Sequence, residues 1–237
     1  EVLGADVSWR RRRGRAEIRV QADQGVVTTG ATSPRGEGPA RLELATLVAD
    51  ARFDPEDLRL EITRTEIALD GISVSGSGDV DDLCDPQLAL EASVFVPMHA
   101  LAEAVGLGQR VGGHLWARVS VEGTAKAPAI SFDVAGSDVA IGVYTPGSFD
   151  VRGALEADTV RIEELRTSAG EGTVLARGRV GLTPRIPVEF EVETYQAELG
   201  PILARSGLPG AWVNFPATGR GRIGGQILPS LDLRGEA

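Results

Sequence analysis

The chain has very little cysteine and lysine and no long apolar run. Cys84 is the only cysteine, which excludes a disulfide within the chain and any zinc site built from cysteines. No stretch of 18 or more apolar residues is present, so no segment is expected to cross a membrane as a helix. No signal peptide is visible and the chain begins with Glu1, so we expect a piece of a longer protein, with any targeting or anchoring segment elsewhere.

The balance of charge excludes one large class of partner. The 237 residues include 24 Lys+Arg against 34 Asp+Glu, for a formal net charge of −10. A nucleic-acid-binding protein needs a basic surface to neutralise phosphates. We therefore expect no nucleic-acid partner.

Glycine and proline are abundant and break the chain into short elements. The sequence has 30 glycines and 13 prolines, while 42% of its residues are hydrophobic. That apolar content is sufficient for a folded domain. The density of helix-breaking residues argues against long helices and favours many short strands joined by turns.

Strict alternation of apolar and polar residues is the dominant pattern. Val188, Phe190 and Val192, for example, alternate with three glutamates. Side chains of a strand point to opposite faces in turn, so each such run has one apolar and one solvated face. This is typical of antiparallel sheets. The clearest runs are 58–63, 117–122, 130–134, 139–143 and 188–193.

Two segments depart from the strand pattern and predict short helices. One is MHALAEAV at 98–105, which follows a proline and ends before a glycine. The other is AELGPILAR at 197–205, which ends two residues before a glycine. Apolar residues at helical spacing followed by a C-terminal glycine are typical of short helices. The helices either pack over a sheet or act as a plug or lid.

The sequence also repeats itself. LRLEITRT at 58–65 matches VRIEELRT at 160–167, and the strands at 88–92 and 188–192 correspond. We infer a unit of roughly 100 residues. The predicted organisation is a tail of a preceding β repeat at 1–57 with an irregular insert at 29–39, a β repeat with a short helix at 58–157, and a second, truncated β repeat with a short helix at 158–237.

Three strand segments share a placement of glycine, proline and alternating residues: ISVSGSGDV at 72–80, VEGTAKAPAISF at 121–132 and GTVLARGRV at 172–180. These segments resemble the TamB/AsmA-like family of bacterial envelope proteins. The order of the predicted elements adds to the resemblance. A strand, a short helix, a glycine-rich stretch and another strand follow one another, and this order occurs twice. Residues 1–39 depart from this pattern.

The resemblance implies a fold, a location and partners. The fold would be mostly β, an elongated antiparallel sheet curved into a groove of the β-taco type. Such bridge-like lipid transfer proteins are held in the inner membrane by a segment that would lie outside this chain, and they cross the periplasm. The implied partners are phospholipid acyl chains and, in outer-membrane assembly, a β-barrel protein of the outer membrane.

The alternating residues themselves predict where a lipid would lie. A sheet with one apolar face must cover that face or leave it open to an apolar guest. The pattern alone leaves both a closed sandwich and an open groove possible, and the repeat with the resemblance favours the groove. The predicted groove-lining residues are Leu58, Leu60, Ile62, Leu88, Leu90, Val119, Val121, Ile130, Phe132, Val160, Ile162, Val188, Phe190 and Val192.

No set of residues predicts catalysis or a cofactor. His99 and His114 are the only histidines and lie in different predicted elements, and no GxSxG turn is present. The acidic stretch 79–85 lacks the spacing of a calcium loop and is interpreted as a solvated turn. The glycines at 106–112 lack the strand that a dinucleotide-binding loop must follow. We therefore expect neither an enzyme nor a metal or cofactor site.

The only basic cluster comprises Arg10 to Arg13 and Arg15. It can contact anionic lipid headgroups. The simpler interpretation is a charged edge strand that discourages aggregation.

Two functions therefore follow from the sequence, and a third is not favoured. The first is a groove that shields lipid acyl chains during phospholipid transport between the inner and outer membranes. The alternative is a structural or assembly scaffold for outer-membrane proteins that acts by pairing of strand edges, without lipid transport. A carbohydrate-binding sandwich needs exposed aromatic platforms, which the scattered Trp9, Trp116 and Trp212 do not predict.

Overall fold

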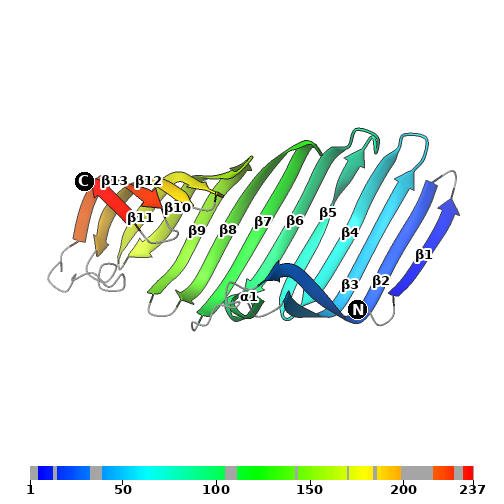
Figure 1. Cartoon of the computed structure of the whole chain (residues 1–237), viewed down its shortest axis with the longest axis horizontal. Coiled ribbons are helices and arrows are strands. Elements are labelled where there is room, and N and C mark those ends of the chain that lie inside the picture. The colour runs from blue at the N-terminus through cyan, green and yellow to red at the C-terminus, as the bar shows by residue number, and fades with distance from the viewer. Residues whose placement is uncertain are drawn as a thin grey trace. The chain divides into compact units, whose positions relative to one another are not determined.

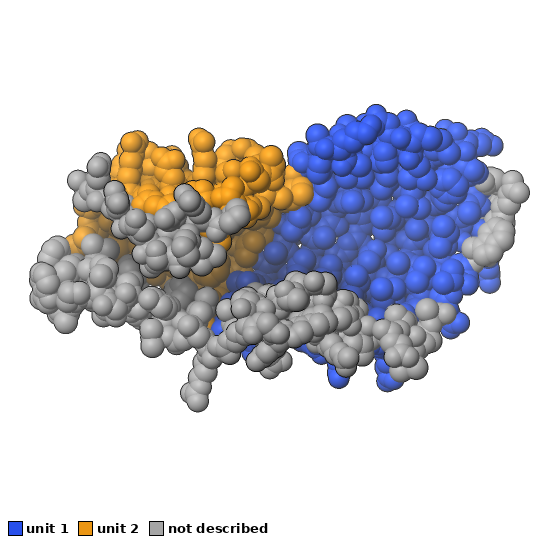
Figure 2. Space-filling model, viewed as in Figure 1, with its two compact units in different colours: residues 1–129 blue, residues 130–237 orange. Residues whose placement is uncertain are grey.

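The computed structural model describes a chain that is mostly β. The residues it describes are 5–12, 15–32, 39–104, 111–141, 144–169, 171–183, 186–198, 216–226 and 232–236. They form two compact units, residues 1–129 and 130–237, shown in different colours in Figure 2. The predicted repeat boundaries at 57/58 and 157/158 fall in turns between strands.

Unit 1 is an antiparallel sheet whose strands follow one another in chain order (Figure 1). Each strand pairs with the next, and no pairing of the first with the seventh is seen among the described residues, so the sheet is not closed. Its strands are β1 (Ala5–Arg12), β2 (Arg15–Thr32), β3 (Pro39–Asp54), β4 (Arg59–Leu69), β5 (Ile72–Asp81), β6 (Gln87–Pro97) and β7 (Val111–Thr124).

The strands of unit 2 are also antiparallel and pair in chain order. Its first strand begins three residues before the division between the units. The strands are β8 (Ala127–Ile141), β9 (Tyr144–Glu156), β10 (Thr159–Ala169), β11 (Gly172–Gly181), β12 (Pro187–Glu198), β13 (Pro216–Gln226) and β14 (Asp232–Glu236).

Turn chemistry explains why the chain reverses where it does. Between β4 and β5, Asp70 and Gly71 both have positive φ, 44° and 79°. Two consecutive residues of this kind make the tight hairpin that matches the twist of the flanking strands, and Asp-Gly is a preferred pair for it. The predicted irregular insert at 29–39 is partly strand, because Thr29–Thr32 end β2 and Pro39 begins β3, while 33–38 lie outside the described residues.

One of the two predicted helices is present. Helix α1 (Met98–Ala104) follows β6 directly, as expected from the sequence. The other prediction fails at its start, because Ala197 and Glu198 are the last residues of β12, and 199–205 lie outside the described residues. Ala197 is buried and paired with Ala217 of β13, so sheet pairing outweighs the helix propensity of the alanine.

The pairing of β10 with β11 matches that of β4 with β5 at positions 100 residues apart. Ile62 is opposite Gly78, Ile162 is opposite Gly178, and the register shifts directly after each isoleucine. The sequence alignment of 58–65 with 160–167 was therefore displaced by two residues. Leu58 precedes its strand in the turn, with a φ of 49°, and cannot match Val160.

Candidate functional site

Cross-strand pairing places the apolar residues of unit 1 on one face. One row crosses β2 to β7, because each residue in it lies directly opposite the next. Directly paired residues have side chains on the same face. This row consists of Ile18, Ala51, Ile62, Gly78, Leu90 and Val121. Two further rows contain Phe53, Leu60, Val80 and Leu88, and Leu47, Ile67, Val74, Val94 and Ala117. Together these rows are called the apolar face of unit 1.

Unit 2 has an apolar face of the same kind. Its central row crosses from β8 to β13, and large side chains alternate with glycine from β8 to β12. This row consists of Phe132, Gly153, Ile162, Gly178, Phe190 and Ile223. Flanking rows contain Ile130, Leu155, Val160, Val180 and Val188, and Val134, Val151, Leu165, Ala176 and Val192.

Most of the residues predicted to line a groove lie on these two faces. Leu60, Ile62, Leu88, Leu90 and Val121 belong to the apolar face of unit 1, and Val119, opposite Ala92, lies on the same side of β7 as Val121. Ile130, Phe132, Val160, Ile162, Val188, Phe190 and Val192 share that of unit 2. Leu58 does not belong to either, because it lies in the turn before β4, where its side chain is exposed.

Glycines on the apolar face of unit 2 make room for aromatic rings. A Cβ at Gly178 would come within 2.8 Å of the Phe190 ring, and one at Gly153 within 2.7 Å of the Phe132 ring. Each phenylalanine therefore lies over the backbone of the neighbouring strand. The ring fills the space that glycine leaves because it has no side chain, as in aromatic rescue of strand glycines.

The apolar faces are only half buried. Among the described residues, the buried apolar side chains are Ala22, Leu44, Met98, Ala100, Ala102, Val139, Val188 and Ala197. No large side chain there is fully buried. The strands make extensive contacts with their sequence neighbours, and α1 alone adds substantial contacts with β3, β6 and β7. A sandwich would bury the two inner faces against each other. Within the described part of each unit, no second sheet does so.

In unit 1, burial is concentrated where α1 packs. Met98, Ala100 and Ala102 are buried on the helix, while His99 between them is exposed. Leu44 of β3, the strand that α1 also contacts, is 4% exposed. The helix therefore covers one end of the strands and leaves the rest of the apolar face uncovered by described residues.

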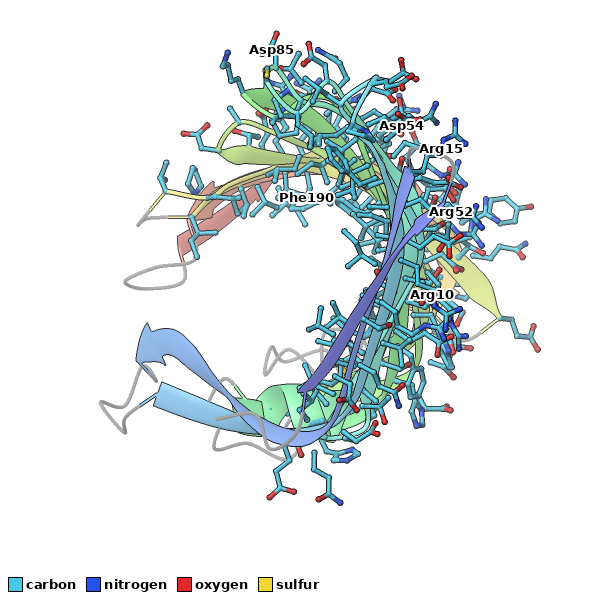
Figure 3. The ribbon with its side chains drawn as sticks, turned by 90° about the vertical axis from the view of Figure 1, so that its right-hand side faces the viewer. Arg10, Arg15, Arg52, Asp54, Asp85 and Phe190 are labelled. Atoms are coloured by element: carbon cyan, nitrogen blue, oxygen red, sulfur yellow. The ribbon has the colours of Figure 1, made fainter. Side chains whose placement is uncertain are left out.

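The strands of unit 1 are bent, so that one face is concave (Figure 3). Arg10, Arg15 and Arg52 lie on the convex side in this view. Apolar rows that cross several neighbouring strands, with no described layer packed over most of them, are typical of an interaction surface.

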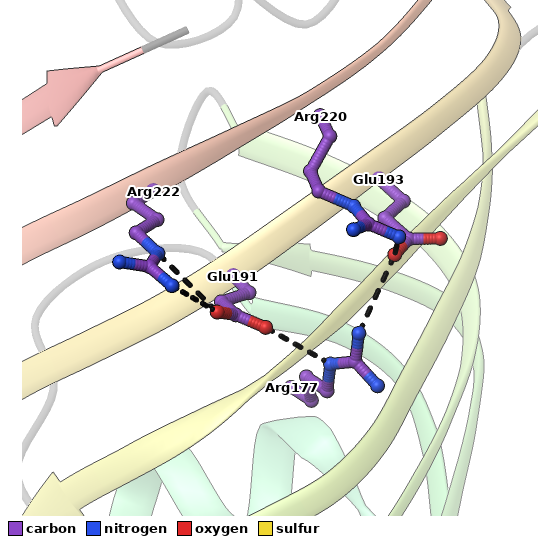
Figure 4. Close-up of polar contacts among 5 residues, drawn as sticks. All are labelled: Arg177, Glu191, Glu193, Arg220 and Arg222. Carbon is purple, nitrogen blue, oxygen red and sulfur yellow. Dashed lines mark hydrogen bonds and ion pairs between the residues drawn. The ribbon is translucent and has the colours of Figure 1, made fainter.

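The opposite face of each sheet is polar and carries cross-strand ion pairs. In unit 2, five side chains form one network across β11, β12 and β13 (Figure 4). Glu191 accepts from Arg177 at 3.2 Å and from Arg222 at 2.8 Å, and Glu193 bridges Arg177 and Arg220. The hydrogen bonds from Arg222 and Arg177 hold the pKa of Glu191 below its ordinary value.

Unit 1 has similar pairs. Arg15 donates to Asp54 at 2.8 Å, and Arg59 donates to Asp79 at 2.8 Å. The hydrogen bond from Arg15 lowers the pKa of Asp54. Exposed pairs of this kind contribute little to stability, because water and salt screen them. Their main consequence is that this face stays solvated, so the two faces of each sheet differ sharply in polarity.

The other candidates from the sequence gain no chemistry from the structure. Among the described residues, no three His, Cys, Asp or Glu side chains lie close enough to hold a metal ion. In the acidic stretch 79–85, Asp79 and Asp81 pair with Arg59, and Asp85 pairs with Lys126. The glycine stretch 106–112 lies outside the described residues except for Val111 and Gly112, which begin β7.

A shallow hollow of about 420 Å³ lies over β11, β12 and β13. Leu175, Tyr195 and Arg220 are among its lining residues. Its acid and base, Glu193 and Arg220, are already paired with each other. The hollow therefore offers a ligand no free charge.

Sequence reasoning missed one surface feature entirely. Phe95, His114 and Trp116 stack together on the polar face of unit 1, with ring centroids 5.4 to 5.9 Å apart. Phe95 and Trp116 are directly paired across β6 and β7. The sequence did contain a signal for this cluster, because Phe95 and Trp116 occupy the positions of their strands that alternation assigns to the polar face.

Comparisons with known proteins give no further guide. Within the described residues, no helix has both the length and the apolar character needed to cross a bilayer. A scan against protein-family models and searches of curated proteins and of solved structures found no match to this chain.

Proposed function

We propose that the two apolar faces hold phospholipid acyl chains, as expected for a groove-forming segment of a periplasm-spanning protein of the TamB/AsmA-like kind. The segment would shield acyl chains in transit between the inner and outer membranes. Its parent protein would be anchored to the inner membrane by a segment outside this chain. This is a binding function without catalysis, and it requires no cofactor.

The observation that supports this proposal most directly is the incomplete burial of the apolar rows. Phe190 and Val192 are half buried, and no described layer packs over them. Removing apolar surface from water is favourable by about 25 cal/mol per Å². An acyl chain laid on this face would gain that free energy without displacing any protein contact among the described residues.

The difference in polarity between the two faces supports one orientation of the bound lipid. An acyl chain has no hydrogen-bonding groups, so it is compatible with the rows of Leu, Ile, Val and Phe. A headgroup is charged and must remain in water, because burying an unpaired charge is costly. The ion-paired face is unsuited to acyl chains, because its charged groups would have to be desolvated.

Native mass spectrometry of the purified chain, with and without added phospholipid vesicles, tests the proposal. We expect bound phospholipid in the wild-type protein. The double variant Phe190→Asp/Val192→Asp should lose it, because two carboxylates on the apolar face would be desolvated by an acyl chain. The matched control Ser131→Asp/Ser168→Asp adds the same charge to exposed positions of the other face and should retain lipid.

Photo-crosslinking gives the position of the lipid. A photoreactive residue at Phe190 or Val192 should label lipid, whereas one at Glu189 or Glu191 should not. Equal labelling from both faces would contradict the proposal. Crosslinks to a protein partner at strand edges without any bound lipid would instead favour the assembly scaffold.

A further inference from the structure

The exposed aromatic cluster of unit 1 has no role in lipid binding, because it lies on the opposite face of the sheet. Leu115 and Ala117 of β7 belong to the apolar side, and His114 and Trp116 alternate with them. The Trp116 side chain is 46% exposed. Phe95 stacks on His114 at 5.6 Å with an interplanar angle of 19°. Large aromatic surface is therefore presented to solvent on a face that is otherwise polar.

The surroundings of the cluster form a regular grid of hydroxyl groups. Pairing between β5, β6 and β7 aligns Ser73, Phe95 and Trp116 in one row. The next row is Ser75, Ser93 and Arg118, and the third is Ser77, Glu91 and Ser120. These nine residues and His114 are called the aromatic–serine patch.

The aromatic–serine patch differs from the rest of the polar face in its charge. It holds one acid, Glu91, and one base, Arg118, so it has no net formal charge with His114 neutral. Neighbouring β2, β3 and β4 carry cross-strand ion pairs such as Arg19–Asp50 at 2.6 Å. Within the described part of the chain, the side chains of the five patch serines make no hydrogen bond, and Glu91 and Arg118 make no ion pair. Their donors and acceptors are available to a ligand.

From this combination we propose that the aromatic–serine patch binds a neutral glycan chain. The apolar face of a pyranose ring presents polarised C–H groups, which are attracted to the negative face of an aromatic ring. The sugar hydroxyls both donate and accept, as do serine hydroxyls. Charge complementarity selects an uncharged occupant, since a patch without net charge in an acidic chain offers no attraction to an anionic polymer.

The proposal is independent of the lipid proposal. The glycan and an acyl chain would occupy opposite faces of the same strands, so neither blocks the other. Because the patch covers three adjacent strands, spaced about 4.8 Å apart, it is wide enough for more than one sugar unit. A chain of several units should therefore bind better than a single sugar.

Isothermal titration calorimetry on the full chain tests the proposal, with chitohexaose and cellohexaose as neutral probes and heparin as the anionic one. We expect at least one neutral hexasaccharide to bind with a Kd of about 1 mM or tighter. Trp116→Ala should weaken binding roughly tenfold. Trp116→Phe, which keeps a ring, should retain most of it. Tyr195→Ala removes an exposed aromatic of unit 2 outside the patch and should change nothing.

Far-UV circular dichroism confirms that each variant is folded. Ser93→Asp provides a second test, since it places a charge at the centre of the patch without removing an aromatic ring and should also weaken binding. The proposal is overturned if neither neutral hexasaccharide binds, if heparin binds more tightly than both, or if Trp116→Ala and Ser93→Asp bind as wild type does. Lipid binding, measured on the same protein preparations, tests the apolar face separately from the aromatic–serine patch.

Discussion

Glycine residues on the apolar face of unit 2 are required by close contacts. Gly178 has no positive φ, so conformational freedom does not explain it. A Cβ there would collide with the backbone carbonyl of Glu189 and lie 2.8 Å from the Phe190 ring. The backbone of a paired strand cannot move aside cheaply, so the position accepts only hydrogen.

Gly178→Ala should therefore destabilise the protein by about 1–3 kcal/mol, as expected for overpacking. Gly219→Ala is the matched control, since a Cβ there meets nothing within 4 Å. That change should be neutral or stabilise by about 0.4–1 kcal/mol, because it reduces the entropy of the unfolded chain. Urea unfolding followed by circular dichroism measures both, and equal effects would contradict this account of Gly178.

The ion pairs of the polar face predict a pH dependence at Glu191. Its pKa is lower in the folded protein than the ordinary value of 4.5 because Arg222 and Arg177 donate to the carboxylate. A lowered folded pKa stabilises the fold above the unfolded pKa, and this stabilisation is lost as the pH falls through the folded pKa.

Glu191→Gln should therefore be less stable than wild type at pH 7, and the difference should shrink as the pH falls below about 4.5. Glu189→Gln, on the same strand and face but without an ion pair among those described, controls for the loss of one carboxylate. Thermal unfolding at a series of pH values measures the difference. A gap between Glu191→Gln and wild type that stays constant down to pH 3 would argue against the ion-pair network.

At the scale of elements, α1 is the clearest local source of burial in unit 1. It contacts β6 and β7, which flank it in sequence, and also β3, which is more than 40 residues away. Met98 at its start is 7% exposed. The helix thus joins distant parts of one sheet at one end of the strands.

Met98→Ala should cost about 2–5 kcal/mol, the usual range for truncating a buried side chain. His99→Ala, at the exposed neighbouring position, should change stability by no more than about 0.5 kcal/mol. Hydrogen exchange of α1, β6 and β7 locates the effect. Loss of protection in unit 2 alone would contradict the placement of this side chain.

The strands show how far periodicity predicts a site. Residues such as Ile62 and Phe190 lie in apolar rows, because alternation fixes the side of the sheet once a strand is assumed. Leu58 fits the same alternation, yet the turn after Asp54 includes it, and the strand starts at Arg59. The alternation does not show where a strand begins, because a turn can use an apolar residue as well.

At the scale of the whole molecule, few of the described side chains are buried, which limits stability. Large apolar surface remains half exposed in both units among these residues, so part of the hydrophobic free energy of folding is not realised in the protein alone. Anything that binds the folded state and not the unfolded one shifts the equilibrium toward folding by mass action.

Phospholipid should therefore stabilise the chain. At a free lipid concentration of 100 Kd, the gain is about 2.7 kcal/mol. Thermal unfolding of lipid-stripped protein, before and after adding short-chain phospholipid below its micelle concentration, measures the shift. Phe190→Asp/Val192→Asp should show no shift, and an equal shift in that variant would mean that the lipid binds elsewhere.

The sequence by itself determined that the chain is mostly β, that its sheets are antiparallel and that Phe190 and its alternating partners share a face. These properties are local, since they depend on side-chain period and turn residues within about ten positions. Only the tertiary structure decided that the rows lie side by side without a second sheet over them among the described residues, and that Phe95 and Trp116 meet. Those facts depend on pairing between strands distant in sequence, which no local pattern encodes.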